Sequence, residues 1–144
     1  MRSPVIVAAA VVGEVVLAIV LPALIMPWVA AIAAGVLLIA AGAALAGWAI
    51  RTLIKSGGSP DPRIADPGLV ESGPFKFSRN PIYVAYVALV AGAGLAANAL
   101  WTSLIASVAA ALIRFTAIRR EEVYLRLRFG GPYKAYRARV RRWL

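Results

Sequence analysis

Cysteine and histidine are both absent from the 144 residues of this chain. Without cysteine there is no disulfide and no thiol nucleophile, and without either residue a zinc site lacks its usual ligands. Acidic residues are also scarce, with six Asp and Glu against sixteen Lys and Arg. We therefore expect no metal cofactor, and any proton transfer must use a carboxylate, a tyrosine, a lysine or water.

Apolar residues are abundant instead, at 62% of the chain, whereas an ordinary soluble domain has roughly 45–50%. They form four runs, over residues 4–26, 28–50, 81–97 and 100–118. A helix needs about 20 apolar residues to cross the hydrocarbon core of a bilayer. We predict an all-α integral membrane protein with about four transmembrane helices, in a single domain over residues 1–144.

The predicted domain has three parts. Residues 1–54 contain two spans, residues 55–80 form a cytoplasmic linker, and residues 81–144 contain a helical hairpin and a C-terminal helix. The linker is rich in Gly, Pro, Ser and Asp, which disfavour a regular helix. In residues 133–144, aromatic and aliphatic side chains recur at helical spacing among basic ones. This pattern predicts an amphipathic helix on the cytoplasmic membrane surface.

The basic residues indicate how the chain sits in the membrane. With four spans, all sixteen Lys and Arg fall on one side. Because cytoplasmic loops carry the excess of basic residues, we expect both termini, and any active site among these residues, to be cytoplasmic. Contact with anionic lipid headgroups explains the net charge of +10, so no nucleic-acid partner is expected.

The stretch SRNPIYVAY, residues 78–86, opens the third run abruptly. Pro81 suits the first turn of a helix, where a missing N–H costs nothing, and Asn80 is the natural N-cap. The positive end of this helix, together with Arg79, predicts an anion site at the cytoplasmic interface. The alternative is a capped helix whose arginine reaches lipid phosphates.

A pair of adjacent carboxylates, Glu121 and Glu122, follows the fourth run. If the third and fourth runs form a hairpin, this pair leaves the membrane close to the start of the third. An anion site would then face two carboxylates, with Phe75 and Tyr83 nearby. This lining suits a zwitterion with an aromatic ring and a cationic centre, such as S-adenosylmethionine. Alternatively, Glu122 and Arg126 form an ordinary i,i+4 ion pair.

The order SGPFKFSRNPIY, a short helical hairpin and REEVYLRLRFGGPYKAYRARV resembles the membrane methyltransferases of the isoprenylcysteine carboxyl methyltransferase type. Phospholipid N-methyltransferases are similar to them. The resemblance covers about residue 67 to the C-terminus. It implies a bundle of membrane helices whose C-terminal half wraps S-adenosylmethionine at the cytoplasmic face, while a lipid or lipidated substrate enters from the bilayer.

The resemblance also implies roles for individual residues. The residues expected to bind the cofactor are Pro67, Gly68, Leu69, Val70, Phe75, Arg79, Asn80, Pro81, Ile82, Tyr83 and Glu121. The catalytic candidates beside them are Glu122 and Arg119, and the substrate candidates are Arg114, Arg120 and Glu14. The last is included because a carboxylate inside a span is a functional hypothesis by default; the alternative is that Glu14 reaches water or pairs with a polar neighbour.

Three positions depart from the family pattern. Asn80 stands where the family has histidine, and Phe75 stands where it has tyrosine. Ala117 occupies the position of the arginine that contacts substrate in the prenylcysteine enzymes, and Arg114, Arg119 or Arg120 could substitute for it. The missing arginine bears on the identity of the substrate more than on the identity of the cofactor.

The acceptor of the methyl group is inferred from acid–base chemistry. A carboxylate acceptor needs no base, whereas an amine is mostly protonated at neutral pH and must first lose a proton. Surrounding arginines lower the pKa of a carboxylate and weaken it as a base. We therefore favour carboxyl O-methylation of an isoprenylcysteine-type acceptor. The alternatives are N-methylation of phosphatidylethanolamine, a nicotinamide-dependent reduction, and a non-enzymatic membrane protein.

Overall fold

The computed structural model describes residues 3–20, 27–58, 68–98 and 101–143, and these residues form helices, turns and one isolated bridge. The predicted all-α class is confirmed for these ranges. The helices are α1 (Ser3–Val20), α2 (Trp28–Lys55), the 3₁₀ turn η1 (Gly73–Lys76), α3 (Pro81–Ala96), α4 (Thr102–Ile113), the π-helical turn η2 (Arg114–Ile118) and α5 (Arg119–Arg139).

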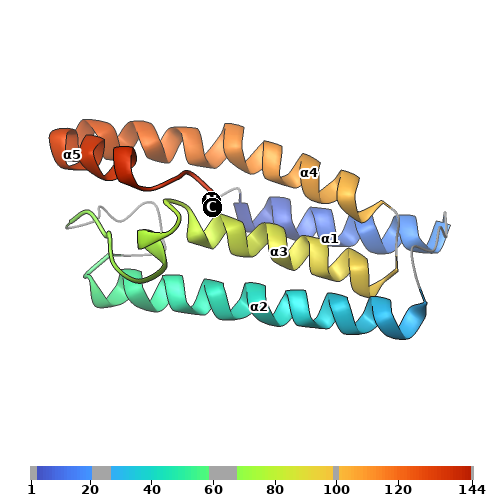
Figure 1. Cartoon of the computed structure of the whole chain (residues 1–144). Helices are drawn as coiled ribbons and strands as arrows, with labels where there is room; N and C mark the ends of the chain where they lie inside the picture. The colour runs from blue at the N-terminus through green and yellow to red at the C-terminus, as the bar shows by residue number, and fades with distance from the viewer. Residues whose placement is uncertain (1–2, 21–26, 59–67, 99–100, 144) are drawn as a thin grey trace.

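Helices α1 to α4 lie side by side as a bundle, with α3 between α2 and α4 (Figure 1). Helix α4 continues through η2 directly into α5, which projects beyond one end of the bundle. The chain then turns back, and its C-terminus lies beside the first turn of α3 (Figure 1). The fold therefore brings the last residues of the chain to the stretch that opens α3.

Small residues let α2 and α3 approach closely. A Cβ added at Gly92 would lie 2.8 Å from Cγ1 and 2.9 Å from the backbone nitrogen of Ile39. Small interface residues of this kind allow close helix packing in membrane bundles. The buried apolar positions of the bundle are accordingly small or medium in size: Ala31, Ala49, Ala85, Val90, Ala106, Ala109 and Ile113.

Within the described ranges, α2 is the one helix long and apolar enough to cross a membrane. It has 28 residues, and its most apolar window has a mean hydropathy of 2.5. Only 17% of that window is buried in the protein, whereas the core helix of a soluble protein is mostly buried. Residues Val5–Leu17 and Pro81–Ala96 form shorter apolar helices. That the four helices α1 to α4 span the membrane stays a prediction.

The predicted runs agree with the observed helices at most of their ends. Helix α2 runs five residues past the predicted end at Ile50, and α3 ends at Ala96, one residue earlier than expected. Residues 21–26, at the predicted end of the first span, lie outside the described residues. In the predicted linker, α2 ends at Lys55 and Gly57 takes a positive φ of 79°, so the described part of this segment is not a regular helix.

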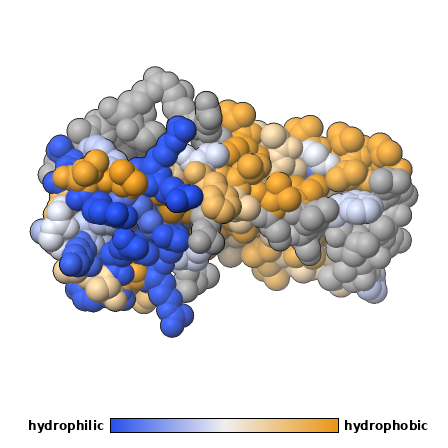
Figure 2. All heavy atoms as spheres, turned by 90° about the horizontal axis from the view of Figure 1, so that it is seen from above, coloured by the Kyte–Doolittle hydropathy of each residue, from blue (hydrophilic) through white to orange (hydrophobic). Residues whose placement is uncertain are grey.

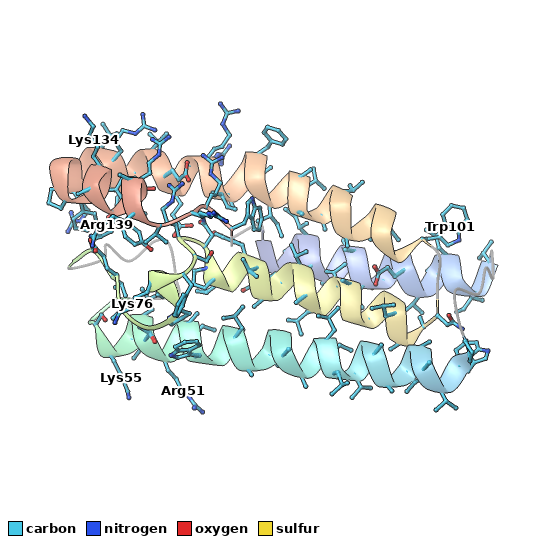
Figure 3. The ribbon with its side chains drawn as sticks, viewed as in Figure 1. Arg51, Lys55, Lys76, Trp101, Lys134 and Arg139 are labelled. Atoms are coloured by element: carbon cyan, nitrogen blue, oxygen red, sulfur yellow. The ribbon has the colours of Figure 1, made fainter. Side chains whose placement is uncertain are left out.

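Polar and apolar side chains separate along the bundle. Seen from above, hydrophilic residues cover the end that carries α5, and hydrophobic residues cover the rest (Figure 2). Figure 3 shows the same separation in single side chains, with Trp101 at the opposite end from five labelled basic residues: Arg51, Lys55, Lys76, Lys134 and Arg139. The basic end is also the end at which α3 begins.

The prediction of one amphipathic helix over residues 133–144 is wrong. Helix α5 ends at Arg139, after a kink at Gly130 with φ 53° and ψ −117°. Residues 140–143, which we name the C-terminal tail, leave the helix at Val140, whose backbone is extended, and bond to the start of α3. Tyr133 and Tyr136 are 2% and 3% exposed, so these rings pack inside the protein and do not lie on a membrane surface.

Candidate functional site

The site begins just before the first turn of α3, where two backbone donors already have partners. The N–H of Asn80 donates to Ser78 Oγ at 3.1 Å, and the N–H of Arg79 donates to the carbonyl of Arg141 at 2.9 Å. Asn80 occupies the N-cap position of α3, as expected, but its side chain makes no capping hydrogen bond. Its side-chain amide instead donates to the carbonyl of Arg142 at 2.8 Å. Any anion site here depends on side chains more than on these backbone donors.

One carboxylate, that of Glu122, is surrounded by two guanidinium groups. Arg79 Nη1 lies 3.0 Å from Glu122 Oε1, and both side chains are 9% exposed. Arg142 binds the same carboxylate with two nitrogens, Nε at 2.8 Å from Oε1 and Nη2 at 2.9 Å from Oε2. The predicted alternative partner of Glu122, Arg126, is not among these contacts.

The two guanidiniums determine the ionisation of Glu122. Burial alone would raise the pKa of its carboxyl, but the hydrogen bond from Arg142 and the charges of Arg142, Arg79 and Arg137 outweigh burial and lower the pKa below 4.5. In return, the hydrogen bond to Glu122 raises the pKa of Arg142. Glu122 is therefore ionised at neutral pH and is a weak proton acceptor.

The second carboxylate of the pair meets the same helix one turn further on. Tyr83 Oη donates to Glu121 Oε2 at 3.0 Å, and the Glu121 residue is exposed at the surface. Both members of the acidic pair therefore bond to the opening of α3, Glu122 through Arg79 and Glu121 through Tyr83. This proximity was expected from the sequence, and the structure confirms it.

The turn η1 is fastened to the end of α5. Tyr136 Oη donates to the carbonyl of Phe75 at 2.7 Å, and Arg139 Nη2 lies 2.8 Å from Glu71 Oε2. Burial raises the pKa of Tyr136, so this hydroxyl stays protonated and remains a donor. Phe75 is thus held at the same end of the bundle as the acidic pair. Gly68, Leu69 and Val70 precede η1 and are partly buried, and Pro67 lies outside the described residues.

The remaining arginines lie around the junction of α4 and α5. Arg119 and Arg120 are exposed in the first turn of α5. The Arg119 guanidinium stands 5.9 Å from the centre of the Phe115 ring, a distance typical of a cation–π contact. The side chain of Arg114 lies outside the described atoms. Ala117 lies in η2, and π-helical turns occur often at functional sites.

Glu14 lies far from this cluster. It is fully buried in α1, and neither carboxylate oxygen has a hydrogen-bond partner among the described residues. The backbone of Gly94 on α3 faces it. Gly94 is 13 residues beyond Pro81 in α3, which is about 20 Å at 1.5 Å per residue. A role of Glu14 in binding substrate stays a prediction, at a different depth from the acidic pair.

Sequence reasoning missed the part of the site that the C-terminal tail provides. Arg142 and Ser78 join it through hydrogen bonds between segments far apart in the sequence. Helical spacing continues through residues 140–143 without a glycine or proline, so nothing local signals that the chain leaves the helix there. The kink at Gly130 could have been suspected from the sequence FGGP at residues 129–132.

The chemistry of these side chains fits a zwitterionic cofactor. Two guanidiniums surround one buried carboxylate, and the buried Arg79 Nε has no hydrogen-bond partner among the described residues. Excess positive charge with an unused donor favours an anionic group, while the exposed carboxylate of Glu121 favours a cationic one. S-adenosylmethionine carries both kinds of group: a carboxylate that suits the arginine cluster and an ammonium that suits Glu121.

A helical bundle with an apolar exterior, whose basic end joins an Arg-Asn-Pro-x-Tyr box to a carboxylate pair, has the features of a membrane methyltransferase. A family model described as phospholipid methyltransferase matches residues 30–131, and the chain belongs to this family. The match begins near the start of α2 and ends within α5, before the C-terminal tail. No curated protein and no solved structure matches the chain.

Proposed function

We propose that this chain transfers a methyl group from S-adenosylmethionine to a lipid acceptor at the cytoplasmic face of a membrane. The observation that carries the proposal is the double attachment of the acidic pair to the box that opens α3: Arg79 to Glu122 at 3.0 Å and Tyr83 to Glu121 at 3.0 Å. The family match supports a membrane methyltransferase independently.

S-adenosylmethionine, when bound, supplies a methyl group already activated by the sulfonium. The task of the protein is then to hold the donor and the acceptor in reacting geometry. Glu121 is the candidate for the cationic amine of the cofactor, since its carboxylate is exposed and oriented by Tyr83. The excess positive charge around Glu122 is the candidate for binding the cofactor carboxylate. Phe75, Ile82 and residues 68–70 are candidates for the adenosine end.

The acceptor we propose first is the headgroup amine of a phospholipid. The family description names phospholipid methyltransferases, and exposed arginines at the start of α5 can hold a lipid phosphate. An ammonium group must lose a proton before it can accept a methyl group. The lowered pKa of Glu122 makes it a poor base, and the carboxylate of Glu121 is assigned to the amine of the cofactor. The proposal therefore leaves the proton of the lipid ammonium to solvent water.

A carboxyl acceptor on a lipid-like tail is the second candidate. It needs cations for positioning and no base. Arg119 and Arg120 are exposed beside the acidic pair and can supply these cations. The preference for a carboxyl acceptor inferred from the sequence rests on such cations and on the lack of a strong base. The position of the substrate arginine in the prenylcysteine enzymes is Ala117 in this chain, and this difference places the carboxyl acceptor second.

The two acceptors are distinguished by offering labelled S-adenosylmethionine to the purified protein with phosphatidylethanolamine and, separately, with a prenylcysteine analogue. We expect base-stable label on phosphatidylethanolamine, because an N-methyl group resists alkali. Base-labile label on the prenylcysteine analogue alone would identify a methyl ester and reverse the order of the candidates. Transfer to neither lipid, with no binding of the cofactor product, would refute the proposed activity.

A further inference from the structure

Arg142 differs from Arg79 in how much of it a ligand can reach. The Arg79 side chain is 9% exposed, whereas the Arg142 side chain is 29% exposed. Arg142 uses Nε and Nη2 to bind Glu122. A guanidinium has five N–H donors in a fixed fork, so donors on the other edge of Arg142 are not used by the bonds to Glu122.

The surroundings of Arg142 hold it in one position. Its carbonyl accepts hydrogen bonds from Asn80 Nδ2 at 2.8 Å and from Ser78 Oγ at 3.4 Å. Its guanidinium is fixed by two bonds to a carboxylate that is itself buried and bound to Arg79. An arginine held at both its backbone and its guanidinium loses little side-chain freedom when it binds a ligand.

The charge of this cluster is not balanced. Two guanidiniums face one carboxylate, and Arg79 Nε is buried without a hydrogen-bond partner among the described residues. An anionic group beside the two arginines would offset this excess positive charge. The exposed edge of this cluster belongs to Arg142.

We propose that Arg142 binds an anionic group of a ligand at this site, either the carboxylate of S-adenosylmethionine or the phosphate of the lipid acceptor. Arg79 acts as a positioning residue, because its contact runs through Glu122. This inference rests on the proposed methyltransferase function and adds to it a residue of the C-terminal tail, which lies beyond the part of the chain that the family model matches.

The test measures binding of S-adenosylhomocysteine and of its decarboxylated analogue by calorimetry, using the full chain in detergent. If the anion is the cofactor carboxylate, Arg142→Ala weakens the binding of S-adenosylhomocysteine by at least about tenfold and leaves the binding of the decarboxylated analogue unchanged. Arg142→Lys gives an intermediate loss, because lysine keeps the charge without the bidentate fork. Arg126→Gln, which removes an exposed charge elsewhere on α5, is the matched control and binds like the wild type.

The second arm measures methyl transfer to phosphatidylethanolamine. If the anion is the lipid phosphate, Arg142→Ala leaves binding of both nucleosides unchanged and raises the lipid KM by at least about tenfold, with kcat preserved. The inference is overturned if Arg142→Ala weakens the binding of both nucleosides equally, if it tightens their binding, or if it changes neither the binding affinities nor the lipid KM. If the wild type neither binds S-adenosylhomocysteine nor transfers a methyl group, the proposed function itself fails, and this inference fails with it.

Discussion

Replacing Glu122 by glutamine tests whether the cluster at the end of the bundle holds the C-terminal tail in place. Glutamine has nearly the same shape but carries no charge. It leaves Arg79, whose side chain is 9% exposed, without its counterion, and it removes the bidentate partner of Arg142. The expected result is a less stable protein whose tail is no longer fixed to the start of α3.

The magnitude follows from burial. Breaking a buried ion pair by removing one partner costs about 3–5 kcal/mol, because the other charge remains uncompensated. The Arg142 side chain is 29% exposed, so solvent screens part of its charge, and losing its partner contributes little to the destabilisation. We expect a loss near the lower end, about 3 kcal/mol, which is about a hundredfold in the folding equilibrium.

Denaturant unfolding in detergent micelles, followed by the helical circular dichroism signal, measures this loss. Glu121→Gln is the matched control, since it makes the same change at the neighbouring carboxylate, which is exposed. The control should lose less than about 1 kcal/mol. If Glu122→Gln unfolds at the same denaturant concentration as Glu121→Gln, the cluster does not stabilise the fold and the argument is refuted.

Three further outcomes follow from the same structure. The folded state lowers the pKa of Glu122 below 4.5, so the stabilising contribution of this carboxylate is present above pH 4.5 and is lost as the pH falls below that value. Acid titration should therefore destabilise the wild type more than Glu122→Gln. An equal dependence of the unfolding free energy on pH in the two proteins would contradict this. Gly92→Ala should destabilise the α2–α3 contact by about 1–3 kcal/mol through overpacking, whereas Gly47→Ala, with nothing within 4 Å of the added Cβ, should not. Single cysteines at Ser56 and Trp101 should react with an impermeant thiol reagent from opposite sides of the membrane, and labelling from one side would rule out the four-span topology.

Local patterns in the sequence predict the helices well. Pro81 begins α3 as expected, and long apolar runs predict α2 and the α3–α4 hairpin to within a few residues at most ends. The meeting of the acidic pair with the opening of α3 also followed from the hairpin, because two adjacent antiparallel helices bring the start of the first beside the end of the second. These features depend on residues close in sequence or on one simple topological step.

The parts that sequence reasoning missed depend on long-range hydrogen bonds. Asn80 is the N-cap residue of α3, as expected, but its side-chain amide donates to the carbonyl of Arg142, 62 residues later, and does not cap the helix. Residues 140–143 continue a helical pattern of basic and apolar side chains, yet they leave the helix because the start of α3 offers them partners. Tyr133 and Tyr136 likewise look like a membrane-facing stripe in the sequence and are buried against the protein.

Calorimetric titration of the purified chain with S-adenosylhomocysteine tests most directly whether the basic end of the bundle binds the methyl-donor cofactor. We expect saturable binding to the wild type, and binding at least about tenfold weaker for Glu121→Ala and for Arg79→Ala, each of which loses a charge-assisted contact at the site. No binding to the wild type, or equal binding to all three proteins, would contradict this expectation.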